Sequence, residues 1–308
     1  MESYFISVVI PTHNSEKYIP ETLHSVFLQT YDNFEIIVSD SGSTDKTRDV
    51  VKKIFHQNKL IKAQLLENID MGPGRNRNMG ILSAKGDWIA FLDSDDFWYR
   101  DKLIKVVESI NIDPSVDLWC HSEVMMVQNK QILLEHYKKF NPNINPFLSM
   151  YRGSSLSTSA VTVKRELLIK VGLFDIDETF AHAEDWELWL RLAKVAKIGY
   201  IKDALGVFAV REGSLTSHSM KVFKALMRIV QKHHNELKKV TRFYFIEEMR
   251  FKGKAFSTAG LGFISKRNLL RGCIFLSIGI LFWPFRIGYL KRVFIRLFKR
   301  KNIDGVLR

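Results

Sequence analysis

Three aspartates follow directly after an apolar run in the segment Trp88–Asp96. Ile89–Leu92 contains no polar residue, which is typical of a strand that is buried on both faces of a parallel sheet. Asp93, Asp95 and Asp96 come next. Because side chains two residues apart on an extended chain point to the same side, Asp93 and Asp95 can converge on one ion. Carboxylate oxygens suit Mg²⁺ or Mn²⁺ that also binds substrate phosphates.

The same segment also has an ordinary structural explanation. An Asp-rich turn closes many strands and caps the helix that follows, because short polar side chains satisfy nearby backbone groups. On this segment alone the two interpretations are equally good. Ligands of open α/β sheets bind at the carboxyl ends of the strands. The choice therefore depends on which other polar residues reach that edge.

The elements that would position these aspartates alternate between strand and helix. Apolar runs predict strands at residues 7–11, 34–39, 63–66 and 89–92, and helical periodicity predicts helices at 16–29 and 45–57. This alternation predicts βαβ units and an α/β fold with a mostly parallel sheet. Farther along, the sequence predicts strands at 118–127 and 159–163, a loop over the site at 128–153, a helix at 184–196 and mainly helix at 217–259.

Polar residues also follow the first two predicted strands. Pro11 and Thr12 end the first strand, and Asp40 follows the second. A carboxylate at this edge can accept hydrogen bonds from a base or a ribose. The alternative is ordinary turn chemistry, because Asp, Asn, Ser and Gly are the residues that turns use.

A glycine-rich segment, Met71–Gly80, precedes the fourth strand. Gly72 and Gly74 would allow close backbone approach, and Arg75 and Arg77 could neutralise a diphosphate. The alternative is a flexible loop with solvated arginines. The glycine spacing fits neither a Walker A loop nor a dinucleotide fingerprint.

Two acids, Glu184 and Asp185, open a predicted helix beside Trp186. A partly desolvated carboxylate in such a place can serve as a general base. The alternative is that both acids only stabilise the helix dipole.

The net charge of +13 is concentrated near the end of the chain. Residues 1–248 contain 32 Lys and Arg against 32 Asp and Glu, whereas residues 249–303 contain 13 Lys and Arg and no acid. Residues 273–285 are uncharged but too few to span a bilayer, which needs about 20 apolar residues. Residues 286–301 place apolar side chains on one helical face and basic ones largely opposite. This pattern favours an in-plane helix on an anionic membrane, through residues 273–301. The alternative is that the tail packs on the protein.

These motifs, in this order, resemble the inverting family 2 glycosyltransferases with the GT-A fold, a Rossmann-like mixed sheet flanked by helices. The resemblance covers roughly residues 5–215. The segments that carry it are Val9–Asn14, Glu35–Asp45, Gly72–Gly80, Ala90–Asp96, Val171–Asp175 and Glu184-Asp185. The Asp-Asp-Gly-Ser usual in the family is Asp40-Ser-Gly-Ser here, so Ser41 replaces the second acid and only an accessory contact is affected.

The resemblance also implies residue roles. Asp185 would be the catalytic base, Asp95 would bind Mn²⁺ or Mg²⁺, and Asp93 would hold the ribose or the sugar. Arg211 and Ser214 would face the diphosphate. The remaining residues expected to bind the nucleotide-sugar are Pro11, Thr12, Asp40, Asn68, Arg77, Ser94 and Glu184.

The expected protein is a metal-dependent inverting transferase that moves a sugar, from a UDP-sugar, to a hydroxyl of a saccharide acceptor that is lipid-linked. Residues 1–215 would form the GT-A domain, with a nucleotide-binding half (1–105) and an acceptor half (106–215), and 216–308 a helical, basic amphipathic region. Two cysteines without zinc or disulfide spacing, and no visible signal peptide, favour a cytoplasmic enzyme on the inner face of the cell membrane.

Three other classes remain as alternatives. A sugar nucleotidyltransferase would need a glycine-rich phosphate loop after the first strand, which Pro11–Asn14 lacks. A non-catalytic binding module would not need the whole set of aspartates. A nucleic-acid binder is disfavoured, because the apolar residues of the tail form one face instead of interleaved stacking positions.

Overall fold

The structure is a computed structural model in which the chain divides into two compact units, residues 1–214 and 215–308. It describes residues 2–69, 72–127, 130–139, 143–153, 156–177, 180, 182–210 and 219–284. The predicted tail helix at 286–301, and Arg211 and Ser214, lie outside these residues.

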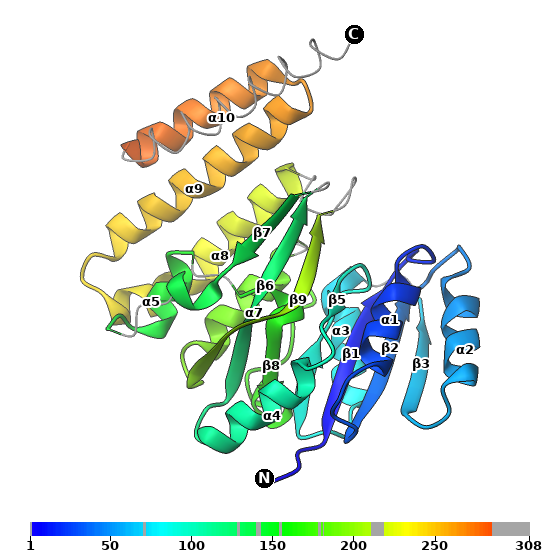
Figure 1. The fold of residues 1–308 in the computed structure, drawn as a ribbon. Helices are drawn as coiled ribbons and strands as arrows, with labels where there is room; N and C mark the ends of the chain where they lie inside the picture. Colours follow the sequence, from blue (N-terminus) through cyan, green and yellow to red (C-terminus); the bar gives the residue numbers. More distant parts are fainter. Residues whose placement is uncertain are drawn as a thin grey trace. The chain divides into compact units, whose positions relative to one another are not determined.

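The first unit is built on one mixed sheet (Figure 1). Its strands, among the described residues, follow the spatial order β3-β2-β1-β4-β8-β6-β9-β5, with β7 paired to β6. Their bounds are β1 Ile6–Thr12, β2 Phe34–Ser41, β3 Lys62–Asn68, β4 Trp88–Phe91, β5 Phe97–Trp98, β6 Leu118–Val127, β7 Lys130–Leu134, β8 Val161–Lys164 and β9 Ile198–Val210.

The parallel half contains β3, β2, β1 and β4. The helices that connect or follow these strands are α1 Ile19–Phe27, α2 Thr47–Gln57, α3 Gly72–Ser83 and α4 Lys102–Ile112. Every residue of β1 and β2 is buried, as the uninterrupted apolar runs predict. The register pairs Thr12 with Asp40 and Ser41 with Asn68, so the polar residues after these strands share one edge.

The other half of the sheet changes direction. β8 pairs antiparallel with both β4 and β6, and β9 runs parallel to β6. Its helical segments are the 3₁₀ turns η1 His136–Lys139 and η2 Thr158–Ala160, and the helices α5 Pro146–Tyr151, α6 Arg165–Lys170 and α7 Glu184–Leu192.

The second unit consists, in its described part, of α8 Ser219–Val240, α9 Tyr244–Ser265 and α10 Leu269–Phe282. In Figure 1, α9 and α10 form an antiparallel hairpin. A Cβ on Gly272 would lie 2.5 Å from Cγ1 of Ile264 and 3.0 Å from the carbonyl oxygen of Gly260, so glycine at this position lets α9 and α10 pack closely. None of the described helices combines the length and the apolar character that a bilayer crossing requires.

The α/β class with a mixed sheet is confirmed, but two predictions about local structure are wrong. The segment 128–153 is not simply a loop, because it contains β7, η1 and α5. The glycine-rich segment from Gly72 onward is helix α3, because its polar side chains bind neighbouring elements instead of solvent. The long strand β9 was not predicted, since Gly199, Lys202 and Asp203 interrupt its apolar pattern.

Gly86 offers a test of how β4 is anchored. A Cβ there would lie 2.6 Å from the backbone nitrogen of Ser7 and 2.7 Å from the carbonyl oxygen of Phe5. Backbone atoms of a central strand cannot move aside as the end of a flexible side chain can. We therefore expect Gly86→Ala to lower the free energy of unfolding by about 1–3 kcal/mol. The measurement is urea denaturation. The exposed neighbour Asp87, changed to Ala, is the control and should stay within about 0.5 kcal/mol. Equal stability of both variants would contradict this account.

Candidate active site

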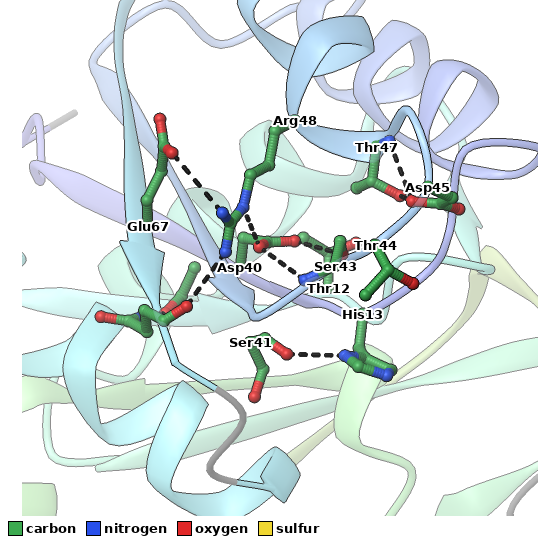
Figure 2. Close-up of polar contacts among 12 residues, drawn as sticks. Thr12, His13, Asp40, Ser41, Ser43, Thr44, Asp45, Thr47, Arg48 and Glu67 are labelled. Atoms are coloured by element: carbon green, nitrogen blue, oxygen red, sulfur yellow. Dashed lines mark hydrogen bonds and ion pairs between the residues drawn. The ribbon is translucent and has the colours of Figure 1, made fainter.

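Asp40, at the carboxyl end of β2, is fully buried and forms an ion pair with the side chain of Arg48 (Figure 2). Its carboxylate accepts hydrogen bonds from the backbone N–H of Ser43, from the Ser43 hydroxyl and from Nε of Arg48. Arg48 also donates to the carbonyl oxygen of Asn68 at 3.0 Å. Sequence reasoning missed Arg48; the signal available was a basic residue in the first turn of the helix that follows Asp40.

A second polar network joins β2, β3 and α3. Asn76 of α3 donates to the carbonyl oxygen of Ser39 at 2.6 Å and accepts from the Ser39 hydroxyl at 2.6 Å. Asn68 donates to Oγ of Ser39 at 2.9 Å. In Figure 2, His13 donates to the carbonyl oxygen of Ser41, at 2.6 Å. Thr12 lies beside it, with a buried hydroxyl that has no partner among the described residues.

The three aspartates after β4 have different environments. Asp96 is buried and accepts hydrogen bonds from the Ser159 hydroxyl at 2.6 Å and from the backbone N–H of Ala209 at 2.9 Å. Burial and the nearby charges of Asp93 and Asp95 raise the pKa of Asp96 well above its usual range. The structural interpretation of this segment therefore holds for Asp96, whereas Asp93 and Asp95 remain partly exposed.

Ser94 is tied to the parallel half of the sheet. Its hydroxyl is hydrogen-bonded to that of Ser15 at 2.9 Å, and its carbonyl oxygen accepts from the hydroxyl of Thr22 at 2.9 Å. The backbone N–H of Asp93 donates to Oγ of Ser159 at 3.1 Å. The aspartate segment is thus held from both halves of the sheet.

Arg77 of α3 joins two of the predicted site carboxylates. It donates to Oδ1 of Asp93 at 2.7 Å and to Oε1 of Glu184 at 2.9 Å. Its guanidinium also lies 5.4 Å from the ring centre of Phe174. Arg77 is only 6% exposed, so the alternative of a solvated arginine is wrong for this residue. Burial lowers the pKa of Arg77, but the charges of Asp93 and Glu184 outweigh it and leave the pKa raised.

Asp185, in the first turn of α7, is next to this ion-pair cluster. Its carboxylate accepts from the backbone N–H of Trp186 at 2.6 Å and from the Thr158 hydroxyl at 3.4 Å. Desolvation and the charge of Glu184 raise the pKa of Asp185 to about 6, although Arg77 acts in the opposite direction. Asp185 is therefore a carboxylate that can exchange a proton near neutral pH.

Contacts of Arg191 and Trp189 fix the position of α7. Glu187 forms an ion pair with Arg191 at 2.7 Å, and Arg191 also donates to the carbonyl oxygens of Val171 and Leu173. On the buried side, Trp189 packs against the ring of Phe91 at 6.2 Å between centres. The helix that carries Glu184 and Asp185 is thus anchored to the core.

The predicted residues fall into two groups along this edge. One group comes from the parallel half and consists of the residues predicted to contact the nucleotide: Pro11, Thr12, Asp40 and Asn68. Direct contacts bring together Arg77, Asp93 and Glu184, with Asp185 adjacent along α7.

Asp93 and Asp95 are the carboxylates that could hold a divalent cation. The described residues contain no cluster of three or more His, Cys, Asp or Glu side chains suited to a metal ion. Asp93 is paired with Arg77, and Asp95 is the residue that the sequence predicts as the metal ligand. One or two carboxylates are what Mg²⁺ uses when substrate phosphates supply the remaining charge. The donor set therefore fits an ion that binds together with a diphosphate.

Comparison with known sequences finds glycosyltransferases. A family model described as "Glycosyl transferase family 2" matches residues 7–170. An uncharacterized glycosyltransferase of Rickettsia conorii is 33% identical over 216 residues, which are 68% of this chain and 34% of the relative. The chain thus spans about a third of that relative's length. The UDP-Glc:alpha-D-GlcNAc-diphosphoundecaprenol beta-1,3-glucosyltransferase WfgD of Escherichia coli is 28% identical over 229 residues, 73% of this chain and 84% of the relative.

Solved structures share the fold at low sequence identity. TarS of S. aureus in complex with UDP-GlcNAc superimposes with a TM-score of 0.59 at 20% identity, over 88% of this chain and 90% of that one. The mannosyltransferase PcManGT from Pyrobaculum calidifontis, in complex with GDP-Man and Mn²⁺, gives a TM-score of 0.61 at 19% identity, over 97% of this chain and 86% of that one. These structures agree with the mixed sheet described above, and the chain belongs to glycosyl transferase family 2, with the GT-A fold.

Proposed function

We propose that the protein transfers a sugar from a UDP-sugar to a hydroxyl group of a saccharide acceptor, with inversion at the anomeric carbon. The observation that carries the proposal is the position of Asp185, a carboxylate with a raised pKa. It follows Glu184 directly on α7, and Arg77 joins Glu184 to Asp93. The names of two similar proteins support the donor class, since WfgD is named for UDP-Glc and TarS was crystallised with UDP-GlcNAc.

In this proposal Asp185 is the general base. Its carboxylate accepts the proton of the acceptor hydroxyl as that oxygen attacks the anomeric carbon, and the nucleoside diphosphate departs from the opposite face. A single displacement of this kind needs one base and no covalent intermediate on the protein. A base with a pKa near 6 is mostly ionised at neutral pH and still accepts a proton readily.

The donor would lie along the ends of β1, β2 and β4. Pro11, Thr12, Asp40 and Asn68 would contact the nucleotide, and the buried Thr12 hydroxyl offers it a hydrogen bond. Asp93 and Ser94 would hold the ribose or sugar beside Glu184, whose Oε2 is buried without a partner among the described residues. Arg211 and Ser214 remain proposed diphosphate contacts.

Asp95 would hold Mn²⁺ or Mg²⁺ in this arrangement. When bound, the cation would offset the negative charge that develops on the leaving diphosphate. The support from this chain is the pair Asp93 and Asp95, which are partly exposed after β4, because one or two carboxylates suit a cation shared with phosphate. Support from outside is the Mn²⁺ in the complex of PcManGT.

The acceptor would be lipid-linked, and the enzyme peripheral on the cytoplasmic face of the cell membrane. Exposed apolar side chains line α10: Leu269, Leu270, Ile274 and Leu281 are 63%, 75%, 48% and 79% exposed. Residues 219–284 contain 13 Lys and Arg against 3 Asp and Glu. An apolar helix face in such basic surroundings suits an anionic bilayer, where each basic residue contributes about 1 kcal/mol. The name of WfgD, which includes diphosphoundecaprenol, supports a lipid-linked acceptor.

The role of Asp185 is tested by Asp185→Asn. The amide cannot accept the proton, so we expect transfer to fall by about 10²–10⁴-fold while the fold and the affinity for the UDP-sugar persist. Transfer is measured with radiolabelled donor, and donor affinity by calorimetry. Asp203→Asn, at an exposed position of β9, is the matched control. Near-normal transfer by the Asp185 variant would remove this residue from the role.

The role of Asp95 is tested by Asp95→Ala in thermal-shift measurements with UDP-sugar and Mn²⁺. A ligand at 100 times its Kd stabilises the native protein by about 2.7 kcal/mol. We expect the wild type to gain such stabilisation only with donor and cation together, and the variant to lose the cation-dependent part. Asp101→Ala, at an exposed position, should behave as wild type. A donor response that EDTA leaves unchanged in the wild type would argue against a metal at Asp95.

The membrane surface is tested by co-sedimentation with vesicles. We expect the full chain to pellet with vesicles that contain phosphatidylglycerol and much less with phosphatidylcholine alone. The double variant Leu270→Asp, Ile274→Asp should lose this binding, because it places two charges on the apolar face of α10. Ile112→Asp, at a site on α4 that is 83% exposed, controls for added charge. Equal pelleting of both variants would contradict a membrane role for α10.

A further inference from the structure

Arg77 is enclosed between two carboxylates that come from distant parts of the chain. Its terminal nitrogens donate to Asp93, which follows β4, and to Glu184, which begins α7, at 2.7 and 2.9 Å. The side chains of Arg77 and Glu184 are 7% and 9% exposed. Charge-assisted hydrogen bonds shielded from water in this way are stronger and more directional than those on a surface.

We propose that Arg77 is a positioning residue: by holding Glu184 against Asp93, it sets the start of α7, and with it the carboxylate of Asp185, relative to the aspartates that receive the donor. This inference rests on the proposed function of Asp185 as the base. It differs from the role that the sequence predicts for Arg77, which is a direct contact with the nucleotide.

The surroundings of Arg77 require an arginine in one orientation. A planar guanidinium can donate to two carboxylates from separate nitrogens, whereas the ammonium of lysine acts as a point charge. The ring of Phe174 lies against the guanidinium. Asn78, on the same helix as Arg77, donates to the carbonyl oxygen of Phe174 at 2.8 Å and accepts from its backbone N–H at 2.9 Å. Helix α3 therefore fixes both the arginine and the ring beneath it.

The charges around Asp185 explain why this position affects catalysis. The charged groups that act on its carboxylate are Glu184 on its own helix, Arg77 on α3 and Asp93 after β4, and Thr158 of η2 adds a hydroxyl. Glu184 and Asp93 both favour the protonated form of Asp185, and Arg77 is the cation that opposes them. Without Arg77, two uncompensated carboxylates would face the base, and its pKa would rise above about 6.

The test measures the ionisation of Asp185 and needs no substrate. The protein is labelled with ¹³C at the aspartate carboxyl carbons, and the Asp185 resonance is assigned from its absence in Asp185→Asn. We expect a midpoint near pH 6 in the wild type and a higher midpoint in Arg77→Gln. Arg77→Lys, which keeps the charge but not the double hydrogen bond, should fall between the two. Arg165→Gln is the matched control, because Arg165 also donates to α3, through the carbonyl oxygen of Ile81, and should leave the midpoint unchanged.

Transfer activity adds a second readout. The acidic limb of the kcat/KM profile should follow the same midpoints. At pH values below the pKa of Asp185, each unit by which that pKa rises lowers the ionised fraction of Asp185 about tenfold. UDP-sugar affinity should change little in Arg77→Lys. An unchanged Asp185 midpoint in Arg77→Gln, or in Arg77→Lys if the first variant does not fold, would overturn the proposal. Lost donor affinity with that unchanged midpoint would instead identify Arg77 as the nucleotide contact.

The two proposals fail in different ways. If Asp185 is not the base, Asp185→Asn retains transfer, whatever the titration shows. If Asp185 is the base but Arg77 does not position it, Asp185→Asn is inactive while the midpoint in the Arg77 variants equals that of the wild type.

Discussion

Ionised carboxylates that are shielded from water at the carboxyl edge of the sheet need a cation close by, and two arginines, Arg48 and Arg77, supply it. A buried carboxylate without a partner is costly, since it loses hydration and gains little in return. Arg48 lies against Asp40, and Arg77 lies between Asp93 and Glu184. Each arginine belongs to the helix that directly follows a parallel strand, α2 after β2 and α3 after β3. The βαβ connection that builds the sheet therefore also delivers the cation to the edge.

The segment after β4 joins the two halves of the sheet. Ser159 donates to the carboxylate of Asp96 and accepts from the backbone N–H of Asp93, while Ala209 of β9 donates to the other oxygen of Asp96. Trp98 adds a hydrogen bond from its indole N–H to the carbonyl oxygen of Ser159 at 2.8 Å. The antiparallel half thus determines how Asp93 and Asp95 are presented, although both follow a strand of the parallel half. Of three neighbouring aspartates, the one turned inward supports the two that face outward.

Local patterns predicted the parallel half well because burial on both faces leaves a clear apolar signal. β1, β2 and β4 correspond to the predicted strands within one to two residues. The same reasoning failed where long-range contacts decide the structure. Helix α3 begins in a glycine-rich segment, and its polar residues Asn76 and Asn78 are used to bind β2 and Phe174. The site acids could be nominated from motifs, but the partners of Arg77 could not, because the chain segments that carry them meet only in the folded sheet.

The environment of Asp185 combines two opposing requirements of a general base. Desolvation and Glu184 raise its pKa and so strengthen it as a base, whereas Arg77 limits the rise and keeps the carboxylate ionised at neutral pH. A pKa below about 4 would leave a weak base, and a pKa well above 7 would leave it protonated for most of the time. Glu184 is therefore more than a helix-capping charge: it raises the pKa of its neighbour and, through Arg77, connects that neighbour to Asp93. Glu184 and Asp185 are adjacent but differ in role: Glu184 binds Arg77, and Asp185 is the proposed base. The positive charge of Arg77 stabilises the ionised form of both carboxylates in a buried site.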